Sequence, residues 1–184
     1  GGKEVFEAKL DSLFSHVNPE IELPIFSTGM IGQYAQGNEP GHHVAYLYNF
    51  TDNPRKGADR LHEIMTTLYT NAPDGLCGNE DCGQMSAWYV LTASGIHPYC
   101  PGETRMEITS PVFDRVEYML DSDYHTGKSF TIIAHDNSDK NIYIDHALLN
   151  GKEYNKCHLD FADISAGGTL ELFMSPTPNK AWGI

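Results

Sequence analysis

The spacing of hydrophobic residues changes once along this chain, near position 100, and that change constrains the fold more than any other feature. Before it, apolar residues recur at the three- and four-residue spacing of helices, as at Phe6, Leu10, Leu13 and Phe14. After it, short apolar runs alternate with turn residues, which is the pattern of strands. We therefore expect an α+β fold, with helical hairpins over residues 1–100 followed by antiparallel strands of a β-sandwich over residues 101–184.

The first two helices should be joined by an unusually long loop. The first helix is expected over residues 3–16, and its start carries no capping residue other than glycine. The connection Asn18–Gly37 is polar and rich in glycine and proline, and a loop of this length in a compact domain is usually functional. A second helix should begin at Pro40, a favoured first-turn residue, and run to about Phe50.

Two further helices complete the first half. Asn53 and Pro54 are expected to cap and begin the third helix. Its inner face should carry apolar residues at helical spacing: Ala58, Leu61, Met65 and Leu68. The fourth helix should run roughly from Cys82 to Ser94, where Gly95 is suited to end it.

The second half should be an antiparallel sheet. Asn150-Gly151 and Gly167-Gly168 read as tight turns between strands. The boundary between the halves is expected near Tyr99–Gly102. The predicted strands are Met106–Thr109, Val116–Leu120, Phe130–Ala134, Ile142–Asp145 and Leu170–Met174.

Composition excludes several classes of function. The net charge is -13, so the surface should repel nucleic acid and anionic lipid, which both bind through Lys and Arg clusters. No run of 18 apolar residues and no signal-peptide pattern is present in the sequence. The four cysteines match no zinc pattern. Cys77 and Cys82 could form a disulfide, and free thiols are an equally good interpretation.

Two loops concentrate acids, amides and glycines at expected helix starts. They are Gln36–His43 and Pro73–Gly83. In the structural interpretation, these residues cap helices, and their acids interact favourably with the helix dipole. The two histidines would then be hydrogen-bonded structural groups, and Trp88 would belong to the core. The functional interpretation is a calcium site, because calcium prefers carboxylate, amide and carbonyl oxygens. Zinc is the rival metal, although adjacent histidines seldom converge on one ion.

The same loops resemble a known family. The strings Gly37-Asn-Glu-Pro-Gly-His-His43 and Gly78-Asn-Glu-Asp-Cys-Gly-Gln-Met-Ser-Ala-Trp88 look like the two signature segments of glycoside hydrolase family 92 α-mannosidases. The later strings Leu149-Asn-Gly-Lys152 and Gly167-Gly-Thr-Leu170 resemble the terminal sheet of that family. The resemblance spans nearly the whole chain in order, and it implies the C-terminal portion of an enzyme with a β-sandwich and an (α/α)6 barrel.

The resemblance also implies a role for particular residues. Gln36, Asn38 and Glu39 match the calcium-binding segment. Asp81 matches the acid assigned as general base, and Glu80 is a second catalytic candidate. Asn79 stands where some members carry another acid, and an amide there can only orient. The expected substrate-binding residues are Asn79 and three ring-bearing residues: His42, His43 and Trp88.

The expected activity is Ca²⁺-dependent, inverting hydrolysis of terminal α-mannosides of glycans by a longer enzyme. The upstream acids match no motif that would supply a general acid: Glu4, Glu7, Asp11, Glu20 and Glu22. We therefore expect the general acid, and a partner surface, in an N-terminal part of the same polypeptide, and we expect the isolated chain to be inactive. The rival functions are a glycan-binding module and a structural fragment. The family resemblance implies a periplasmic or extracellular location.

Overall fold

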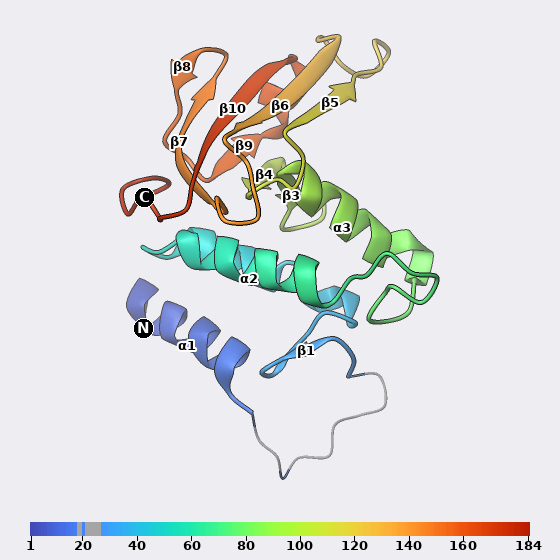
Figure 1. Ribbon diagram of the computed structural model, residues 1–184. Helices are drawn as coiled ribbons and strands as arrows, with labels where there is room; N and C mark the ends of the chain where they lie inside the picture. The colour runs from blue at the N-terminus through green and yellow to red at the C-terminus, as the bar shows by residue number, and fades with distance from the viewer. Residues whose placement is uncertain (18–19, 21–26) are drawn as a thin grey trace.

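The computed structural model describes residues 1–17, 20 and 27–184, which form a helical layer against two β-sheets (Figure 1). The α-helices of that layer are α1 (Gly2–Ser15), α2 (Arg55–Thr67) and α3 (Gln84–Ser94). Part of the expected loop, including Asn18, Pro19, Glu22 and Pro24, lies outside the described residues. Its described remainder contains a hairpin of β1 (Met30–Ile31) and β2 (Tyr34–Ala35).

Helices α1 and α2 bury the faces that the sequence predicts. Leu10 and Phe14 of α1 are buried, and the Phe14 ring lies 4.9 Å from that of Tyr34. On α2, Leu61 and Met65 are buried. The sequence therefore places both helices correctly, because their faces depend on local spacing, but the expected inner face of α1 is wrong at Phe6, which is exposed.

The expected second helix is wrong in type. In place of an α-helix over Pro40–Phe50, the chain forms two 3₁₀ helices, η1 (Glu39–Gly41) and η2 (Val44–Phe50). Valine, tyrosine, asparagine and phenylalanine have modest α-helix propensity, and tertiary contacts decide the winding here. The Tyr46 and Tyr48 hydroxyls bond in different directions, to Thr92 Oγ1 at 2.6 Å and to Asp11 Oδ1 at 2.9 Å.

The expected starts of the other two helices need correction. Asn53 does not cap α2, because its amide donates instead to Glu7 Oε2 at 2.6 Å. Helix α3 begins at Gln84 rather than Cys82. Cys82 and Gly83 have φ values of 53° and 79°, which are incompatible with a right-handed helix, and they form the 3₁₀ turn η3 (Asp81–Gly83) with Asp81. Gly95, at φ 99°, ends α3 as expected.

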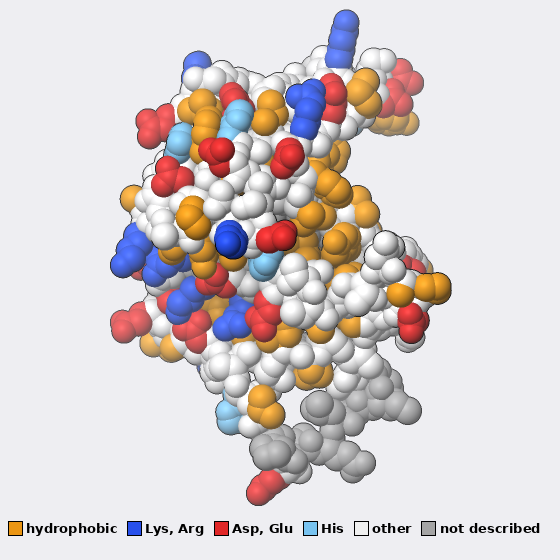
Figure 2. All heavy atoms as spheres, viewed as in Figure 1, with side chains coloured by type: hydrophobic (Ala, Val, Ile, Leu, Met, Phe, Trp, Pro, Cys, Tyr) orange, Lys and Arg blue, Asp and Glu red, His pale blue; other side chains and the backbone are white. Residues whose placement is uncertain are grey.

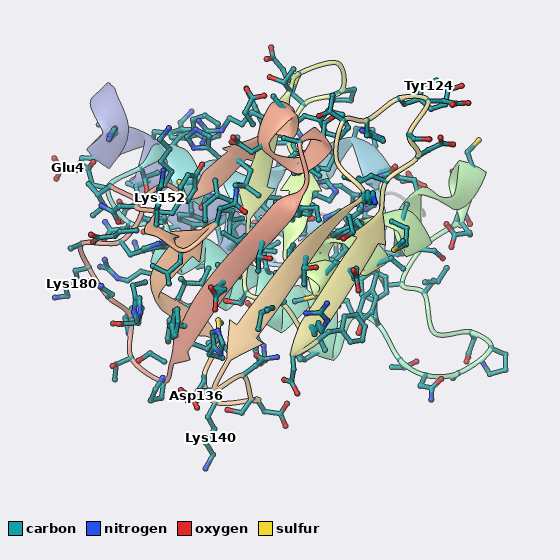
Figure 3. The ribbon with its side chains drawn as sticks, turned by 90° about the horizontal axis from the view of Figure 1, so that it is seen from above. Glu4, Tyr124, Asp136, Lys140, Lys152 and Lys180 are labelled. Carbon is teal, nitrogen blue, oxygen red and sulfur yellow. The ribbon has the colours of Figure 1, made fainter. Side chains whose placement is uncertain are left out.

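The second half forms two sheets. The smaller is antiparallel in the order β3 (Ile96–Pro98), β4 (Arg105–Ile108) and β9 (His158–Asp160). The larger has the order β5-β6-β10-β7-β8, and its strands lie side by side in Figure 3. They are β5 (Arg115–Met119), β6 (Ser129–His135), β7 (Tyr143–Leu149), β8 (Lys152–Glu153) and β10 (Gly168–Ser175).

Strand pairing departs from the expectation at one place. β10 runs parallel to β6, whereas the other pairs are antiparallel. The helix α4 (Phe161–Ser165) lies in the connection between β9 and β10. The Asn150-Gly151 turn joins β7 to β8 with positive φ at both residues, as its sequence predicts.

The buried hydrophobic residues separate into two clusters. One joins the helices and the β1–β2 hairpin and ends at Ala93; the other begins at Ile96 and contains residues of both sheets. The division of the chain at residue 100 and the membership of the helices in an (α/α)6 barrel stay predictions. Over residues 1–17, 20 and 27–184, no helix is both long and apolar enough to cross a membrane.

Candidate active site

The two loops singled out by the sequence touch each other. A Cβ atom added to Gly78 would lie 2.6 Å from Gly37 Cα and 2.8 Å from the Gly37 carbonyl oxygen. Backbone therefore meets backbone, and only glycine allows this approach. In Figure 1 the loop that follows α2 bends back toward the β1 hairpin and then enters α3. The fold thus brings the Glu39 turn and the Asp81 turn to one place, as the sequence predicts.

Gln36 begins the first loop, and hydrogen bonds hold its side chain in the protein interior. Its side chain is fully buried; it accepts a hydrogen bond from the Tyr34 hydroxyl and donates to the Tyr69 hydroxyl at 2.8 Å. Its carbonyl oxygen accepts from His42 Nε2 at 2.9 Å. Because these polar atoms already have protein partners, the structure favours a supporting role for Gln36 in the loop.

Asn38 and Glu39 do not behave as helix caps. Asn38 is exposed and precedes η1, yet its side chain makes no capping hydrogen bond. Glu39 is half-buried, and within the described residues its Oε1 atom is enclosed without a hydrogen-bond partner. A buried carboxylate oxygen without a donor is costly unless a cation or another donor meets it. The donor chemistry of both side chains therefore fits calcium.

These two residues cannot form a complete calcium shell alone. Among the described residues, no group of three or more His, Cys, Asp and Glu could hold a metal ion. Calcium takes about six to eight oxygens, so the remaining ligands would be backbone carbonyls, water, sugar hydroxyls or another part of the polypeptide. The same finding leaves the described residues without a zinc cluster.

The second loop presents one free carboxylate and one engaged carboxylate. Asp81 is exposed, and over the described part of the chain its carboxylate has no hydrogen-bond or ion-pair partner. Glu80, also exposed, accepts from the Ser86 backbone N–H at 3.2 Å and from the Ser86 hydroxyl. These bonds with Ser86 lower the pKa of Glu80. Glu80 thus stabilises the first turn of α3, whereas Asp81 is available to bind water. Asn79, which precedes them in the sequence, is also exposed.

His42 and Trp88 lie behind the loops rather than at their surface. His42 is 3% exposed and Trp88 is 0% exposed, and the indole Nε1 donates to the His42 carbonyl at 3.0 Å. Burial lowers the pKa of His42. Burial therefore favours the core interpretation for both side chains. His43 is half-buried, and its ring makes no hydrogen bond within the described residues.

Cys77 and Cys82 are free thiols, as are Cys100 and Cys157. Cys77 is half-buried against Gly29, where a Cβ atom on that glycine would lie 2.5 Å from the Cys77 sulfur. Burial raises the pKa of the Cys77 thiol. The sequence left open a Cys77–Cys82 disulfide or free thiols, and in the structure both cysteines are free thiols.

Sequence reasoning missed three residues of this site. Tyr34 and Tyr69 hold Gln36, and Gln84 Nε2 lies 3.2 Å from His42 Nδ1. Gln84 lies inside the second signature string, so its place in that string was a signal that could have found it. The two tyrosines lie outside both strings, and only the fold reveals their contacts.

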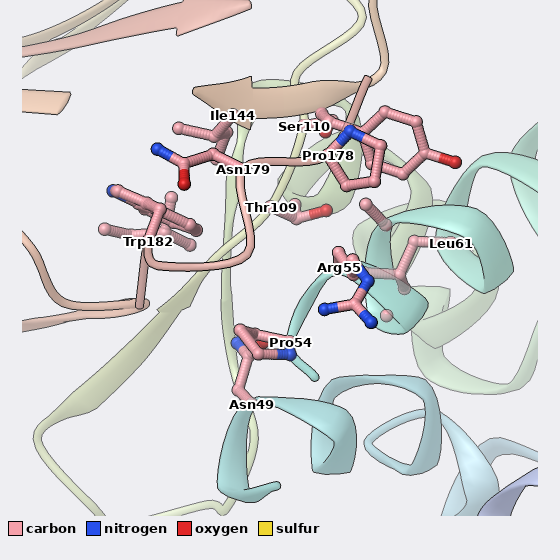
Figure 4. A pocket seen from close by; sticks show the side chains of 14 residues that line it. Asn49, Pro54, Arg55, Leu61, Thr109, Ser110, Ile144, Pro178, Asn179 and Trp182 are labelled. Carbon is pink, nitrogen blue, oxygen red and sulfur yellow. The ribbon is translucent and has the colours of Figure 1, made fainter. Parts of the chain in front are cut away.

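A separate small pocket lies between the start of α2, the residues after β4 and the C-terminal segment (Figure 4). Thr109 Oγ1 and Trp182 Nε1 line it, and both atoms are buried without a hydrogen-bond partner among the described residues. The sequence-predicted site residues are not among those that line this pocket. The candidate site is therefore separate from this pocket.

Comparison with known proteins identifies the class and then the family. The model of the glycosyl hydrolase family 92 catalytic domain matches residues 1–176. This match identifies the chain as glycoside hydrolase sequence. The chain belongs to glycosyl hydrolase family 92, as its two signature strings predict.

Individual relatives agree with this assignment. A family 92 α-mannosidase from Bacteroides thetaiotaomicron is 39% identical with a TM-score of 0.89, and the match covers 100% of this chain and 24% of that one. A structure of the same mannosidase with mannoimidazole has a TM-score of 0.91. A family 92 inverting mannosidase from the same bacterium is 38% identical with a TM-score of 0.83, covering 100% and 26% of the two chains.

A curated relative, an uncharacterized secreted glycosidase of Arthroderma benhamiae, is 32% identical over 185 residues, which cover 100% of this chain and 21% of the relative. The chain thus spans about a quarter of the length of the mannosidase structures and a fifth of this relative.

Proposed function

We propose that this chain is the C-terminal part of a Ca²⁺-dependent, inverting exo-α-mannosidase that hydrolyses terminal α-mannosides of glycans. One observation carries the proposal: the loop with the buried, unpartnered Glu39 oxygen touches the loop with the free Asp81 carboxylate. Two similar structures, at 38–39% identity, are α-mannosidase and inverting mannosidase structures of this family.

In the proposed reaction, Asp81 accepts a proton from the attacking water. Its exposed carboxylate can contact that water directly, and Glu80 keeps the turn in place through Ser86. Asn38 and Glu39 would hold the calcium ion, which would supply a Lewis acid for sugar hydroxyls. The proposed sugar contacts are the exposed Asn79 and the half-buried His43.

The general acid should come from outside this chain. It must face the base across about 6.5–9.5 Å and hold a proton at working pH, which requires a raised pKa. Hydrogen bonds from Lys56 and Asn53 lower the pKa of Glu7. Burial raises the pKa of Asp11, but hydrogen bonds from Lys56 and Tyr48 outweigh it and lower the pKa overall. Neither carboxyl is therefore suited to protonate a leaving group.

The remainder of a family 92 polypeptide is the proposed partner, and α3 offers a surface for it. A groove runs beside α3 between Tyr69, Leu76, Val90 and Phe113. Val90 is 59% exposed and Phe113 is 50% exposed. Figure 2 shows hydrophobic side chains gathered around a hollow at the right-hand edge of the molecule. Since Leu76 precedes the Asp81 turn, a segment in this groove would also lie close to the site.

Kinetics of substituted complete enzyme test the proposal. Asp81→Asn should lower kcat by about 10²–10⁴-fold with little change in KM, because the amide keeps the shape but cannot accept the proton. Glu80→Gln should cost less, since its carboxylate serves Ser86. Each variant is measured on one activated and one natural α-mannoside. A dead Glu80→Gln beside an active Asp81→Asn would exchange the two roles, and two fully active variants would refute the catalytic interpretation.

The second candidate is a glycan-binding module without catalysis, which would fit the lack of a recognised general-acid motif among the upstream acids of this sequence. Mannose titrations with and without a chelator, beside an activity assay, separate the two functions. Binding with no turnover by the complete polypeptide would favour the module. A location outside the cytoplasm, periplasmic or extracellular, is also part of the proposal, and the secreted relative supports it.

A further inference from the structure

One side-chain hydrogen bond joins the first loop to the first residue of α3, directly after the second loop. Gln84 Nε2 lies 3.2 Å from His42 Nδ1, and His42 Nε2 lies 2.9 Å from the Gln36 carbonyl oxygen. An amide nitrogen can only donate, so Nδ1 accepts, and the proton of the neutral ring sits on Nε2, where it reaches the carbonyl. Both ring nitrogens are therefore occupied, and the orientation of the ring is fixed.

The two hydrogen-bonded residues, Gln84 and His42, have the same sequence separation from the proposed functional groups. Gln84 follows Asp81 by three residues and is the first residue of α3, whereas His42 follows Glu39 by three residues and ends η1. The bond consequently connects the turn that carries the base to the turn that carries the calcium ligand. A change in its length would move one carboxylate relative to the other.

We propose that Gln84 and His42 are positioning residues whose hydrogen bond sets the separation of Asp81 and Glu39. This inference rests on the proposed function. It assigns neither side chain a contact with substrate, because His42 is almost fully buried and Gln84 points its amide at His42. The effect on catalysis passes through the position of the two carboxylates.

Two other contacts also hold the first loop against the second loop and α3. Trp88 Nε1 donates to the His42 carbonyl from within α3, one turn after Gln84. The Gly37–Gly78 approach fixes the loops at their other end. The loops are thus tied at the backbone on one side and through His42 on the other, and Glu39 and Asp81 lie between these contacts in the sequence.

The test uses Gln84→Met in the complete enzyme. Methionine keeps the length of the side chain but removes the donor. Gln33→Met is the matched control, because Gln33 is exposed and its side chain has no hydrogen-bond partner within the described residues. The measured quantities are kcat, KM on an activated α-mannoside, and the calcium concentration that restores half of the activity after chelation.

We expect Gln84→Met to lose about 10–100-fold in kcat or in calcium affinity, with KM changed less, as residues that support metal ligands usually do. Gln33→Met should match the unsubstituted enzyme. His42→Phe removes this bond and also the bond to the Gln36 carbonyl, so its loss should be at least as large. The double variant should be no worse than His42→Phe alone, since the Gln84–His42 bond is already absent there. Gln84→Asn, which keeps the amide but is too short, serves if Gln84→Met fails to fold.

Kinetics and calcium dependence equal to those of Gln33→Met would overturn the inference, even if Gln84→Met unfolds at a lower temperature. The outcome is distinguishable from failure of the proposed function. If Asp81→Asn is impaired and Gln84→Met is not, only the positioning role is wrong. If Asp81→Asn and Glu39→Ala are both fully active, the proposed function itself is wrong.

Discussion

Two Arg-x-Glu pairs, one on β4 in the smaller sheet and one on β5 in the larger sheet, differ mainly in burial. They give a sharp test of how the sheet half is joined to the helices. Glu107 of β4 is 0% exposed and accepts hydrogen bonds from Arg105 and, at 2.7 Å, from the Asn49 amide of η2. Glu117 of β5 pairs with Arg115 at 3.2 Å, and its side chain is 44% exposed. We predict that Glu107→Ala is far more destabilising than Glu117→Ala.

The expected magnitudes follow from what each substitution leaves behind. Breaking a buried ion pair usually costs about 3–5 kcal/mol, because the remaining charge is left without its partner. Arg105 is 26% exposed and keeps its stacking on Phe50, with its guanidinium 4.3 Å from the ring centroid, so we expect the low end, about 3 kcal/mol. An exposed pair such as that of Glu117 contributes only about 0.2–1 kcal/mol.

Amide hydrogen exchange measures these losses within the complete polypeptide, where a single unfolding transition is not expected. The reporter for Glu107 is the Ile108 amide, which donates to the Cys157 carbonyl at 2.9 Å. A loss of about 3 kcal/mol should speed its exchange roughly 100-fold. The amides of β5 should accelerate less than about tenfold in Glu117→Ala. Equal acceleration in the two variants would refute the reasoning.

Three further predictions follow from the loops and the helices. Gly78→Ala should lower the free energy of unfolding by about 1–3 kcal/mol because its methyl group meets the Gly37 backbone. Gly41→Ala is the control, since its Cβ atom would lie 3.7 Å from the nearest atom, and equal stability of the two variants in thermal unfolding would contradict the prediction. Lys56→Met should lower the free energy of unfolding at pH 7, because Lys56 pairs with Glu7 and Asp11, whose pKa values are lowered from the ordinary 4.5 and 3.8. The stabilisation from these carboxylates is full above those two values and is lost on acidification, so the stability difference between variant and unsubstituted protein should shrink as the pH falls below them. A difference that persists at pH 2 would contradict it. The isolated chain should show no measurable α-mannosidase activity, and turnover at a hundredth of the complete enzyme's rate would disprove that.

Elements defined by local patterns could be predicted from the sequence. Helix α1, the inner face of α2 and the C-terminal glycine of α3 follow from short-range spacing and from the backbone freedom of glycine. The five longest strands lie close to where alternation and turn residues place them. The short strands β3 and β9 carry too few residues to show a period, and the fold alone reveals them.

The errors arise where tertiary contacts override local preference. The segment after Pro40 has helical spacing, but 3₁₀ winding satisfies the two tyrosine hydroxyls through distant partners. Asn53 has the chemistry of a cap, yet Glu7, 46 residues away, takes its amide. The pairing of Gln36 with Tyr69 spans 33 residues, so only the fold reveals it.

At the site, the signature strings located the loops, and the structure sorted the residues within them. Asp81 and Glu80 are adjacent carboxylates with similar local sequence signals, and only the contact with Ser86 separates a free group from an engaged one. The same holds for His42 and His43, because burial and the contacts with Gln84 and Gln36 distinguish them.

The calcium dependence of the complete enzyme tests the central claim most directly. After treatment with a chelator, kcat is measured while free Ca²⁺ or Zn²⁺ is returned, for the unsubstituted enzyme and for Glu39→Ala. The account predicts that calcium restores the unsubstituted enzyme, that zinc does not, and that Glu39→Ala loses most of its activity together with its calcium response. Full activity in the chelated enzyme, or restoration by zinc and not by calcium, would contradict the account.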